Sequence, residues 1–483
     1  MNRLIKNELK KLFSKKLMYI LFIIAMGIVI LTKVLYSFDI ADLSDKQYLE
    51  RELSYLEEEM KNEEYKLQEN KETLIGLQVE YERIKLELNF DIDSWQYNYI
   101  DREGNIDELI RNIKVSEAKK DSNAIEQANI EYNEIKQKLE SGDWQSIAKE
   151  QLEKINSQIN NLQNLSKDVK NITTSQEINT ELENMKISKQ ALEWRLEKNI
   201  PFDNKFASLK IIEYENYSQI INGLKDKENK TEEEKKNYEE ALKVANVAKY
   251  YIENNIVIEK EYNSASFIAN IMDEYGVFII IFSIIVAGTI VSSESQKGTI
   301  KLLLTRPYSR NKILLSKYLV SILSVFIFIL LFLITEFIVG GIIDGFDIFK
   351  IPMVEYNIKT SSVVVMGVCK YSIIKTLMSL PLVILLTTLG FSLSTIISNS
   401  AISVAMPILG YMSSNIINLF IERIKILKYF VTANWDLSIY MFGGKGIAEG
   451  LNFAVSLLIC LIYLLIMLIT TFIVFNKRDI KNV

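Results

Sequence analysis

The 483-residue sequence contains no histidine, two cysteines and five prolines. Without histidine, neither imidazole catalysis nor the common histidine-containing zinc sites can be built. The two cysteines, Cys369 and Cys460, lie at the border of one apolar run and inside another, so no disulfide scaffold is expected. We therefore expect no catalytic residue, no metal site and no bound cofactor on this chain.

The sequence also lacks a phosphate-binding loop, because G-x-x-x-x-G-K-[ST] occurs nowhere in it. No segment expected in the cytoplasm is long enough to hold a nucleotide-binding domain. If ATP drives this protein, a second polypeptide must bind the nucleotide and its Mg²⁺. We expect the chain itself not to be an enzyme.

Charge is distributed very unevenly along the sequence. Residues 39–274 hold 32 Lys and Arg against 51 Asp and Glu, a net charge of −19, whereas the remainder holds 24 against 10, a net charge of +14. An acidic, hydrophilic insert therefore interrupts a basic framework. Its negative charge excludes nucleic acid as a partner of the insert.

The framework contains six apolar runs that predict membrane-spanning helices. They are residues 17–38, 275–291, 313–343, 371–397, 401–421 and 451–475. We expect an all-α, polytopic membrane protein in contact with lipid. Only residues 398–400 separate the fourth and fifth runs, which predicts a helical hairpin with a tight turn.

Basic residues flank the first and last runs and set the expected orientation. Residues 1–16 predict an amphipathic helix at the membrane interface, and the tail 476–483 is also basic, so both termini are expected in the cytoplasm. A signal peptide is the alternative for the N-terminus. It is disfavoured because the first run is about 22 residues, long enough to span, and no small-residue cleavage pattern follows it. Lys33 in this run is expected to reach the outer headgroups.

The insert, residues 39–274, has helical periodicity. Leucines and other apolar residues recur every seven positions from Leu53 to Leu88, which predicts a coiled-coil-like helix of roughly 40 residues, about 60 Å long. Breaks are expected at 89–105, 141–144, 200–204 and 222–231. The four tryptophans include three in the insert, and the simplest interpretation is that they fill its core. The alternative is that the tip, Phe90 to Ile106, binds an extracellular ligand, with acidic charge favouring a cation.

Between the second and third runs lies a connector, residues 292–312, with the sequence SSESQKGTIKLLLTRPYSRNK. Its five Lys and Arg outnumber Glu294, giving a net charge of +4, and the positive-inside rule places it in the cytoplasm. Ile300 and Leu302 to Leu304 predict a short apolar helical turn that Pro307 ends. This sequence pattern, an acidic residue after a membrane helix followed by GTIKLLLTRPYSR, resembles that of permease subunits of ABC-2 type exporters.

That resemblance implies that the connector docks on a separate ABC ATPase subunit. The residues implied in coupling are Glu294, Lys297, Gly298, Thr299, Ile300, Leu303, Leu304, Arg306, Pro307 and Arg310. It also implies a second copy of the permease or a related chain, a bacterial cell membrane, and outward transport of an unidentified peptide, antibiotic or lipid. The large insert departs from the simpler family members, which have a short loop there.

The later membrane runs hold polar residues with two interpretations. Thr388, Ser392, Ser414, Asn415 and Asn418 either line a translocation path or allow close helix packing, and packing is the favoured reading. Glu336 lies either on such a path or, as its position favours, at the headgroups. The outer segment 344–370 is expected to be a loop, and 422–450 to form short re-entrant helices, as in the similar permeases.

Two other classes of function fit the same pattern. A helical ectodomain followed by several spans also resembles phage-receptor and secretion-accessory membrane proteins, which would make the chain a scaffold without transport. Alternatively, the chain is a mechanical transmitter that moves the outer insert without passing a substrate. An ATPase that copurifies with the chain would separate the scaffold from the other two.

Overall fold

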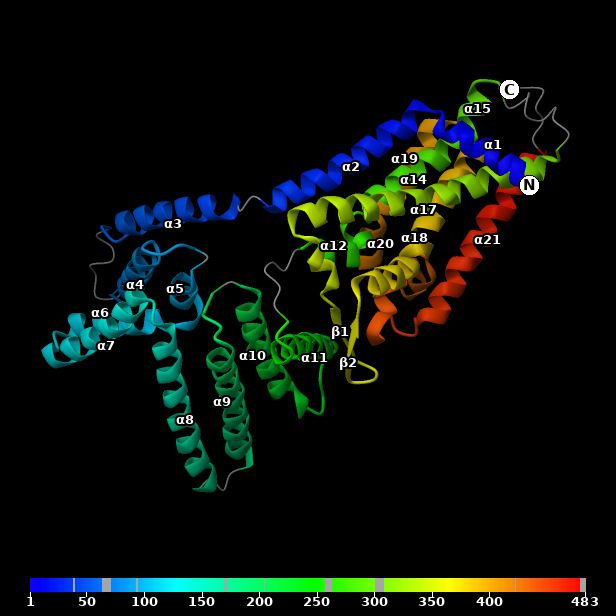
Figure 1. The fold of residues 1–483 in the computed structure, drawn as a ribbon. Helices are drawn as coiled ribbons and strands as arrows, with labels where there is room; N and C mark the ends of the chain where they lie inside the picture. Colours follow the sequence, from blue (N-terminus) through cyan, green and yellow to red (C-terminus); the bar gives the residue numbers. More distant parts are fainter. Residues whose placement is uncertain are drawn as a thin grey trace. The chain divides into compact units, whose positions relative to one another are not determined.

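The computed structural model describes residues 1–37, 40–62, 71–92, 94–168, 172–203, 205–256, 263–299, 308–421 and 423–477. The chain divides into two compact units. The first, here the membrane unit, combines residues 1–37 with the part from 262 onward; the second, here the insert unit, comprises residues 38–261. Figure 1 shows the two units, each built almost entirely of helices.

The membrane unit contains six helical segments that are long and apolar enough to cross a membrane, among the residues described. Its main helices are α1 (Asn2–Phe13), α2 (Lys16–Ser37), α12 (Ser264–Ala269), α13 (Ile271–Glu274), α14 (Gly276–Ile290), α15 (Ser292–Gln296), α17 (Arg310–Ile343), α18 (Val368–Ile396), α19 (Ser400–Met412), α20 (Ser414–Leu419) and α21 (Phe453–Lys477). The protein is therefore an all-α, multi-pass membrane protein, as the sequence predicts.

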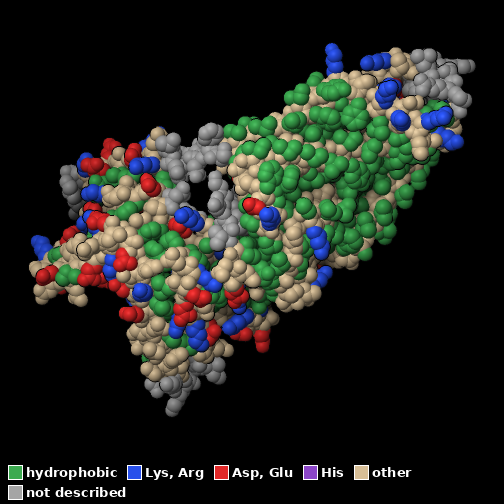
Figure 2. All heavy atoms as spheres, in the orientation of Figure 1, with side chains coloured by type: hydrophobic (Ala, Val, Ile, Leu, Met, Phe, Trp, Pro, Cys, Tyr) green, Lys and Arg blue, Asp and Glu red, His purple; other side chains and the backbone are tan. Residues whose placement is uncertain are grey.

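Helix α14 lies at the centre of the membrane unit and packs against α17, α18 and α19. Its sequence, GVFIIIFSIIVAGTI, is apolar on all sides, which is the pattern of a helix buried within a bundle. By contrast, α2 and α21 expose most of their apolar side chains. Figure 2 shows these side chains as a broad apolar surface over the membrane unit, as contact with lipid requires.

The predicted hairpin of the fourth and fifth spans is present as α18 and α19. The turn between them is short because Ser398 adopts a left-handed φ of 56° and Asn399 caps α19. The Asn399 Oδ1 accepts hydrogen bonds from the amides of Ala401, at 2.9 Å, and Ile402, at 3.3 Å. Both helices contain a proline, Pro381 in α18 and Pro407 in α19.

Between α17 and α18 the structure contains a β-hairpin where the sequence predicted only a loop. Strands β1 (Met353–Asn357) and β2 (Ser362–Met366) pair antiparallel, with Val354 opposite Val365. The hairpin follows the 3₁₀ helix η4 (Phe346–Lys350). Its β-branched residues favour strands, but the two runs are so short that their pattern is weak in the sequence.

Three short 3₁₀ helices occupy the segment before the last span: η5 (Lys425–Tyr429), η6 (Val431–Ala433) and η7 (Ser438–Gly443). The amide of Ile358 in the hairpin turn donates to the Phe442 carbonyl at 3.1 Å. Gly443 allows this approach, because a Cβ there would lie 2.9 Å from the Lys359 nitrogen. The segment is thus helical in short pieces; its re-entry into the membrane stays a prediction.

The insert unit is a set of helices joined by short turns. They are α3 (Ile40–Glu59), α4 (Lys71–Glu87), α5 (Trp95–Asn98), the π-helix η3 (Tyr99–Glu103), α6 (Ile106–Lys119), α7 (Ser122–Ser141), α8 (Trp144–Asp168), α9 (Ile172–Lys198), α10 (Phe206–Lys225) and α11 (Glu232–Glu253). The predicted single helix across Leu53 to Leu88 is wrong, because α3 ends at Glu59; residues 63–70, which precede α4, lie outside the described residues.

The predicted breaks 141–144, 200–204 and 222–231 coincide with connections between helices, whereas 89–105 contains α5 and η3. Gly142, with φ 76°, ends α7, and Thr231 begins α11 with a capping box in which Thr231 and Glu234 bond each other's backbone. The three tryptophans of the insert pack in or against its hydrophobic core, as expected. The Phe202 ring lies 5.2 Å from the Tyr99 ring and 6.3 Å from the Trp144 ring, and Trp194 lies 4.7 Å from Tyr214.

Candidate functional site

The membrane unit holds two clusters of charged side chains, one at each end of α17. The end of the unit that contains α1, α15 and the start of α17 is here named the loop end, because the connector 292–312 lies there. The end that contains the last turn of α2, α12 and the last turn of α17 is named the insert end. At this end the chain enters and leaves the insert unit, just after Ser37 and just before Asn263.

The loop-end cluster centres on Lys317 of α17. Its Nζ lies 2.8 Å from Glu8 Oε2 on α1 and 2.8 Å from Glu294 Oε1 on α15. Lys11 of α1 forms a further ion pair with Glu294. The Lys317 and Glu294 side chains are only 3% and 6% exposed. Three helices, α1, α15 and α17, are thus joined by buried ion pairs.

The local sequence explains how Glu8 comes to this cluster. Leu4, Glu8 and Leu12 recur every four residues, so they share one face of α1, and all three are buried. A carboxylate in the middle of an apolar helix face needs a partner, which Lys317 supplies. This role of Glu8 was not predicted, because the many lysines of residues 1–16 indicate a basic surface helix; the position of Glu8 between Leu4 and Leu12 was the available signal.

Serine hydroxyls fix α15 to the hairpin of α18 and α19. The Ser292 amide donates to Ser394 Oγ at 2.9 Å, and the Ser292 and Ser400 hydroxyls share a hydrogen bond of 2.8 Å. Ser400 Oγ also donates to Gln296 Oε1 at 3.0 Å. Gly288 permits close packing here, since a Cβ would lie 2.8 Å from Val404 Cγ2. Helix α15, which forms the first residues of the connector, therefore contacts α1, α17, α18 and α19.

The predicted coupling residues are described only in part. Glu294 lies in the loop-end cluster, and Thr299 Oγ1 donates to the Glu294 carbonyl at 3.3 Å. Lys297 and Gly298 are exposed, with Gly298 at φ 67°, and Arg310 donates to the Asn476 carbonyl at 3.0 Å. The remaining predicted residues, Ile300, Leu303, Leu304, Arg306 and Pro307, lie outside the described residues.

The residues of the predicted translocation path form two separate groups. On α18, Thr388 shares a hydrogen bond of 3.0 Å with Tyr318 of α17, and Ser392 is 4% exposed. On α20, Ser414 donates to the Tyr411 carbonyl at 2.6 Å, whereas Asn418 accepts a hydrogen bond of 3.0 Å from Thr432. Asn415 is exposed. Among the residues described, no hydrogen bond joins the two groups, and the local bonds support the packing interpretation.

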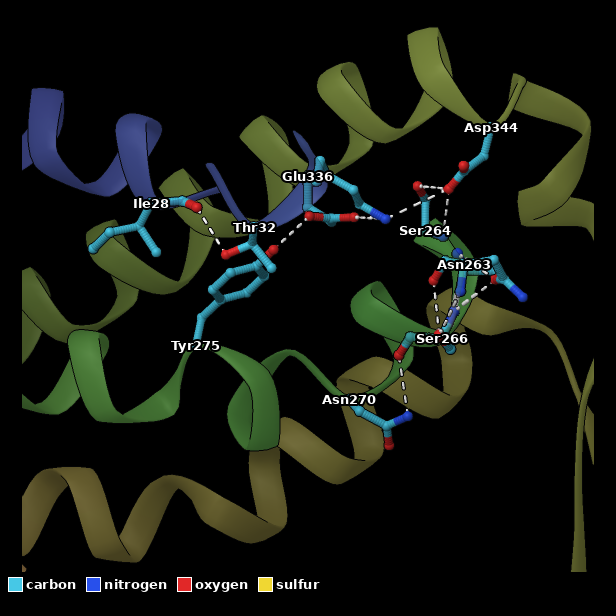
Figure 3. Close-up of polar contacts among 11 residues, drawn as sticks. Ile28, Thr32, Asn263, Ser264, Ser266, Asn270, Tyr275, Glu336 and Asp344 are labelled. Atoms are coloured by element: carbon cyan, nitrogen blue, oxygen red, sulfur yellow. Dashed lines mark hydrogen bonds and ion pairs between the residues drawn. The ribbon is translucent and has the colours of Figure 1, made fainter. Parts of the chain in front are cut away.

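The insert-end cluster joins α2, α12 and α17. Lys33 Nζ of α2 lies 3.0 Å from Glu336 Oε1 and 3.5 Å from Asp344 Oδ2, and it sits 4.2 Å from the centre of the Phe267 ring. Figure 3 shows Tyr275 directed at Glu336 and Ser264 directed at Asp344. The Tyr275 hydroxyl donates to Glu336 Oε2 at 2.8 Å, and the Ser264 amide donates to Asp344 at 2.8 Å.

Asn263 holds the start of α12 in place for these contacts. Its side-chain oxygen accepts hydrogen bonds from the amides of Ala265, at 2.9 Å, and Ser266, at 3.1 Å, while Ser266 Oγ accepts from the Asn263 amide. Gly340 of α17 leaves room for the Ser264 side chain, which a Cβ at this position would overlap. A helix cap and a glycine thus place Ser264 beside Asp344.

The headgroup predictions for Lys33 and Glu336 are wrong. Their side chains are 3% and 0% exposed because each partner withdraws the other from the surface. Both predictions rest on the rule that a single charge near the end of a span normally reaches the interface. Opposite charges at matching depth in two spans were the signal that would have suggested a pair.

Helix α17 connects the two clusters. From Lys317 to Glu336 it runs 19 residues without proline, a distance of roughly 28 Å at the normal helical rise. Neither cluster has the composition of a metal site, and no group of three His, Cys, Asp or Glu that could hold a metal occurs in the described ranges. What the arrangement can do is transmit a displacement from one end of the helix to the other.

Comparison with known proteins assigns the chain to a protein family. The family model described as "Protein of unknown function (DUF2705)" matches residues 237–481, just over half of the chain. "Uncharacterized protein YhcI" of Bacillus subtilis strain 168 is 30% identical over 234 residues, which cover 48% of this chain and 74% of the relative. "Uncharacterized membrane protein YdbK" of the same strain is 26% identical over 201 residues, 41% of this chain and 76% of the relative. No solved structure matches the chain.

Proposed function

The chain belongs to the DUF2705 family of proteins of unknown function, and we propose that it is the membrane subunit of an ABC-type exporter in a bacterial cell membrane. In this proposal a separate ATPase subunit binds ATP and Mg²⁺ and docks on the connector 292–312. The loop end and both termini face the cytoplasm, and the insert unit lies outside. A second permease chain, identical or related, completes the transporter, whose cargo is a peptide, antibiotic or lipid.

The loop-end cluster is the observation that supports this proposal most directly. Glu294, near the start of the connector, forms an ion pair with Lys317 of the long helix α17. Lys317 also forms an ion pair with Glu8 on α1. Breaking a buried ion pair by removing one partner typically costs about 3–5 kcal/mol, so the three helices should move together. A partner that pushes on the connector would therefore move α1 and α17 as well.

The distribution of charge supports the orientation. Lysines and arginines gather at the loop end of the membrane unit in Figure 2, and the connector has a net charge of +4. The positive-inside rule then favours the cytoplasm for this end. The same charge excess would suit an acidic groove on the ATPase.

A mechanical transmitter is the second candidate, and the insert-end cluster favours it. Lys33 and Ser264 lie close to the two points where the chain enters and leaves the insert unit, and both contact the last turns of α17. Movement of α17 would therefore reach both connections of the insert. In that case ATP hydrolysis would move the insert unit, and no substrate would cross the membrane.

Purification from native membranes tests the ATPase partner. The full-length chain with an affinity tag should copurify a polypeptide that contains a Walker motif. A matched variant in which Leu303 and Leu304 are replaced by glutamate should insert normally but lose that polypeptide, while the control Lys359→Glu, Thr360→Glu in the β-hairpin turn should retain it. A complex without any ATPase would favour the scaffold function instead.

Passage of substrate separates the two ATP-driven functions. The purified complex is reconstituted in sealed vesicles, and ATP-dependent movement of candidate peptides and lipids across the bilayer is measured. Transport supports the exporter. ATP hydrolysis that changes the accessibility of residues in the insert unit, with no solute crossing, supports the transmitter.

A further inference from the structure

The insert unit contains a cleft with a volume of about 890 Å³ that plays no part in the proposed coupling. Its lining comes from η3, α6, α7, α8, α9 and α10. Sites that hold small organic ligands usually measure about 300–1,000 Å³. The cleft is therefore large enough to hold a ligand of the size of a short peptide.

Buried side chains from several elements line the deep part of this cleft. Tyr99, Leu192 and Arg195 are 3%, 8% and 2% exposed. The Arg195 guanidinium is held in place because it donates to the Pro201 carbonyl and to Ser208 Oγ, both at 2.9 Å, and lies over the Phe202 ring. The lining is thus partly aromatic and apolar, and its one deep cation is already engaged with the protein.

An unusual backbone segment contributes one wall. Tyr99 begins the π-helix η3, and Asn105, two residues after its end, has a left-handed φ of 47°. Gly104 between them packs against the Tyr99 ring so closely that a Cβ would lie 2.5 Å from Cε1. π-Helical turns are rare and occur frequently at functional sites. This wall falls within the tip segment, Phe90 to Ile106, for which the sequence offers ligand binding as one of two interpretations.

Four glutamates line the cleft. Among the residues described, Glu108, Glu131 and Glu215 form no ion pair, whereas Glu150 is neutralised by Lys138. Lys154 is a cleft cation that has no ion-pair partner in the described ranges. Since the insert as a whole is strongly acidic, its field adds to this local excess and attracts cations. The lining as a whole carries four glutamates against Arg102, Lys154 and Arg195, a net charge of −1, beside an apolar and aromatic interior.

We propose that this cleft is a binding site for a short cationic peptide with apolar side chains. The basic groups of the peptide would contact Glu108, Glu131 and Glu215, and its apolar side chains would pack near Tyr99 and Leu192. Binding would occur on the insert unit alone and would need no ATPase. The inference therefore goes beyond the proposed transport function and can fail or succeed independently of it.

Binding of defined probes to the full-length protein in lipid nanodiscs tests the site. The probe is the fluorescein-labelled amide peptide Lys-Trp-Lys-Leu-Phe-Lys, and its charge-reversed counterpart is Glu-Trp-Glu-Leu-Phe-Glu. We expect saturable binding of the first and none of the second. The double variant Glu131→Gln, Glu215→Gln should weaken binding about tenfold, because two partly solvated charge contacts are removed.

Matched variants distinguish the cleft from general attraction to an acidic surface. Glu126→Gln, Glu153→Gln removes the same charge from exposed positions of the same unit outside the cleft, and should leave binding within about twofold of the parent. Asn216→Trp places an indole in the cleft and should abolish binding, whereas Asn237→Trp on α11 should not.

Three results would overturn the proposal. The first is no saturable binding of the cationic peptide to the parent protein. The second is equal weakening by the two double carboxylate variants, which would show attraction by the unit as a whole. The third is preferential binding of the anionic peptide, which would assign the cleft to the opposite charge.

Discussion

Lys33 on α2 and Glu336 on α17 form an ion pair of 3.0 Å within the apolar membrane unit, with both side chains almost wholly removed from the surface. Such a pair in a membrane segment is expensive to keep unless each charge satisfies the other. Tyr275 satisfies the second carboxylate oxygen of Glu336 by a hydrogen bond of 2.8 Å. The pair therefore holds the first membrane helix to the third.

The first prediction concerns the stability that this pair provides. Lys33→Met leaves Glu336 buried without its cation, and we expect the membrane unit to lose about 3–5 kcal/mol of stability. The double variant Lys33→Met, Glu336→Met removes both charges and should recover most of that loss. Heated size-exclusion chromatography of the protein in detergent measures the difference.

The control for this prediction is Lys359→Met, which removes an exposed lysine from the β-hairpin turn. Its effect should stay within about 0.5 kcal/mol, as is usual for the surface. If Lys33→Met unfolds at the same temperature as this control, the ion pair does not stabilise the fold.

The second prediction concerns the loop end. Lys317→Met leaves Glu8 and Glu294 facing each other without the cation that joins them. We expect the complex with the ATPase to assemble but ATP-driven transport, or movement of the insert unit, to fall by about tenfold or more, equivalent to roughly 1.4 kcal/mol of lost coupling.

Lys6→Met is the matched control, because it removes an exposed lysine of α1 at the same end, outside the connector 292–312 and outside the ion-pair cluster. It should keep most of the activity in the same vesicle assay. Equal loss in both variants would mean that the total positive charge of the loop end matters, and that the buried contacts do not.

The third prediction uses the two native cysteines to test the proposed orientation. Cys369, at the start of α18 at the insert end, is exposed, and Cys460 in α21 is buried. In intact cells, a membrane-impermeant maleimide should label the protein once, and Cys369→Ser should abolish that labelling. Labelling that requires disrupted cells would place the insert end in the cytoplasm and reverse the orientation.

The fourth prediction concerns pH and the insert unit. Burial raises the pKa of Glu87 from its ordinary value near 4.5 to about 7, although Arg83 lies 2.5 Å away and opposes the shift. Because the folded pKa is the higher one, the protonated form favours folding. That stability is complete below pH 4.5 and is lost as the pH rises through 7.

Hydrogen exchange of α4 in the full-length protein measures this loss. After correction for intrinsic rates, protection should fall between pH 6 and pH 8 by a free energy of about 1.3 kcal/mol. Glu87→Gln should flatten the dependence, and the control Glu80→Gln on the same helix should leave it unchanged. A steep fall that persists in Glu87→Gln would assign the pH dependence to other groups.

Much of the membrane unit could be predicted because long apolar runs leave few alternatives to a spanning helix. The six spans and the turn at Ser398 to Ser400 follow from run length and spacing. The breaks of the insert were also predictable, because Gly142 and Thr231 mark helix ends by conformational preference and capping. These are local properties, and local properties are visible in a sequence.

The clusters were not predictable in the same way, because their members are distant in the chain. Glu8 and Lys317, like Lys33 and Glu336, meet only when α1, α2 and α17 pack together. The sequence around each residue does not indicate which residue it will pair with. The long helix expected from Leu53 to Leu88 failed for a related reason. A heptad pattern shows which face is apolar, but tertiary packing decides whether the helix continues.

The length of α17 makes the protein sensitive to the thickness of the lipid bilayer. Its 34 residues extend about 51 Å, whereas the hydrocarbon core of a typical bilayer is about 30 Å thick. The excess has to be taken up by tilt or by local thickening of the bilayer. Since this helix joins the two charged clusters, its inclination sets their relative depth, and bilayer thickness becomes a variable to which both ends of the molecule respond.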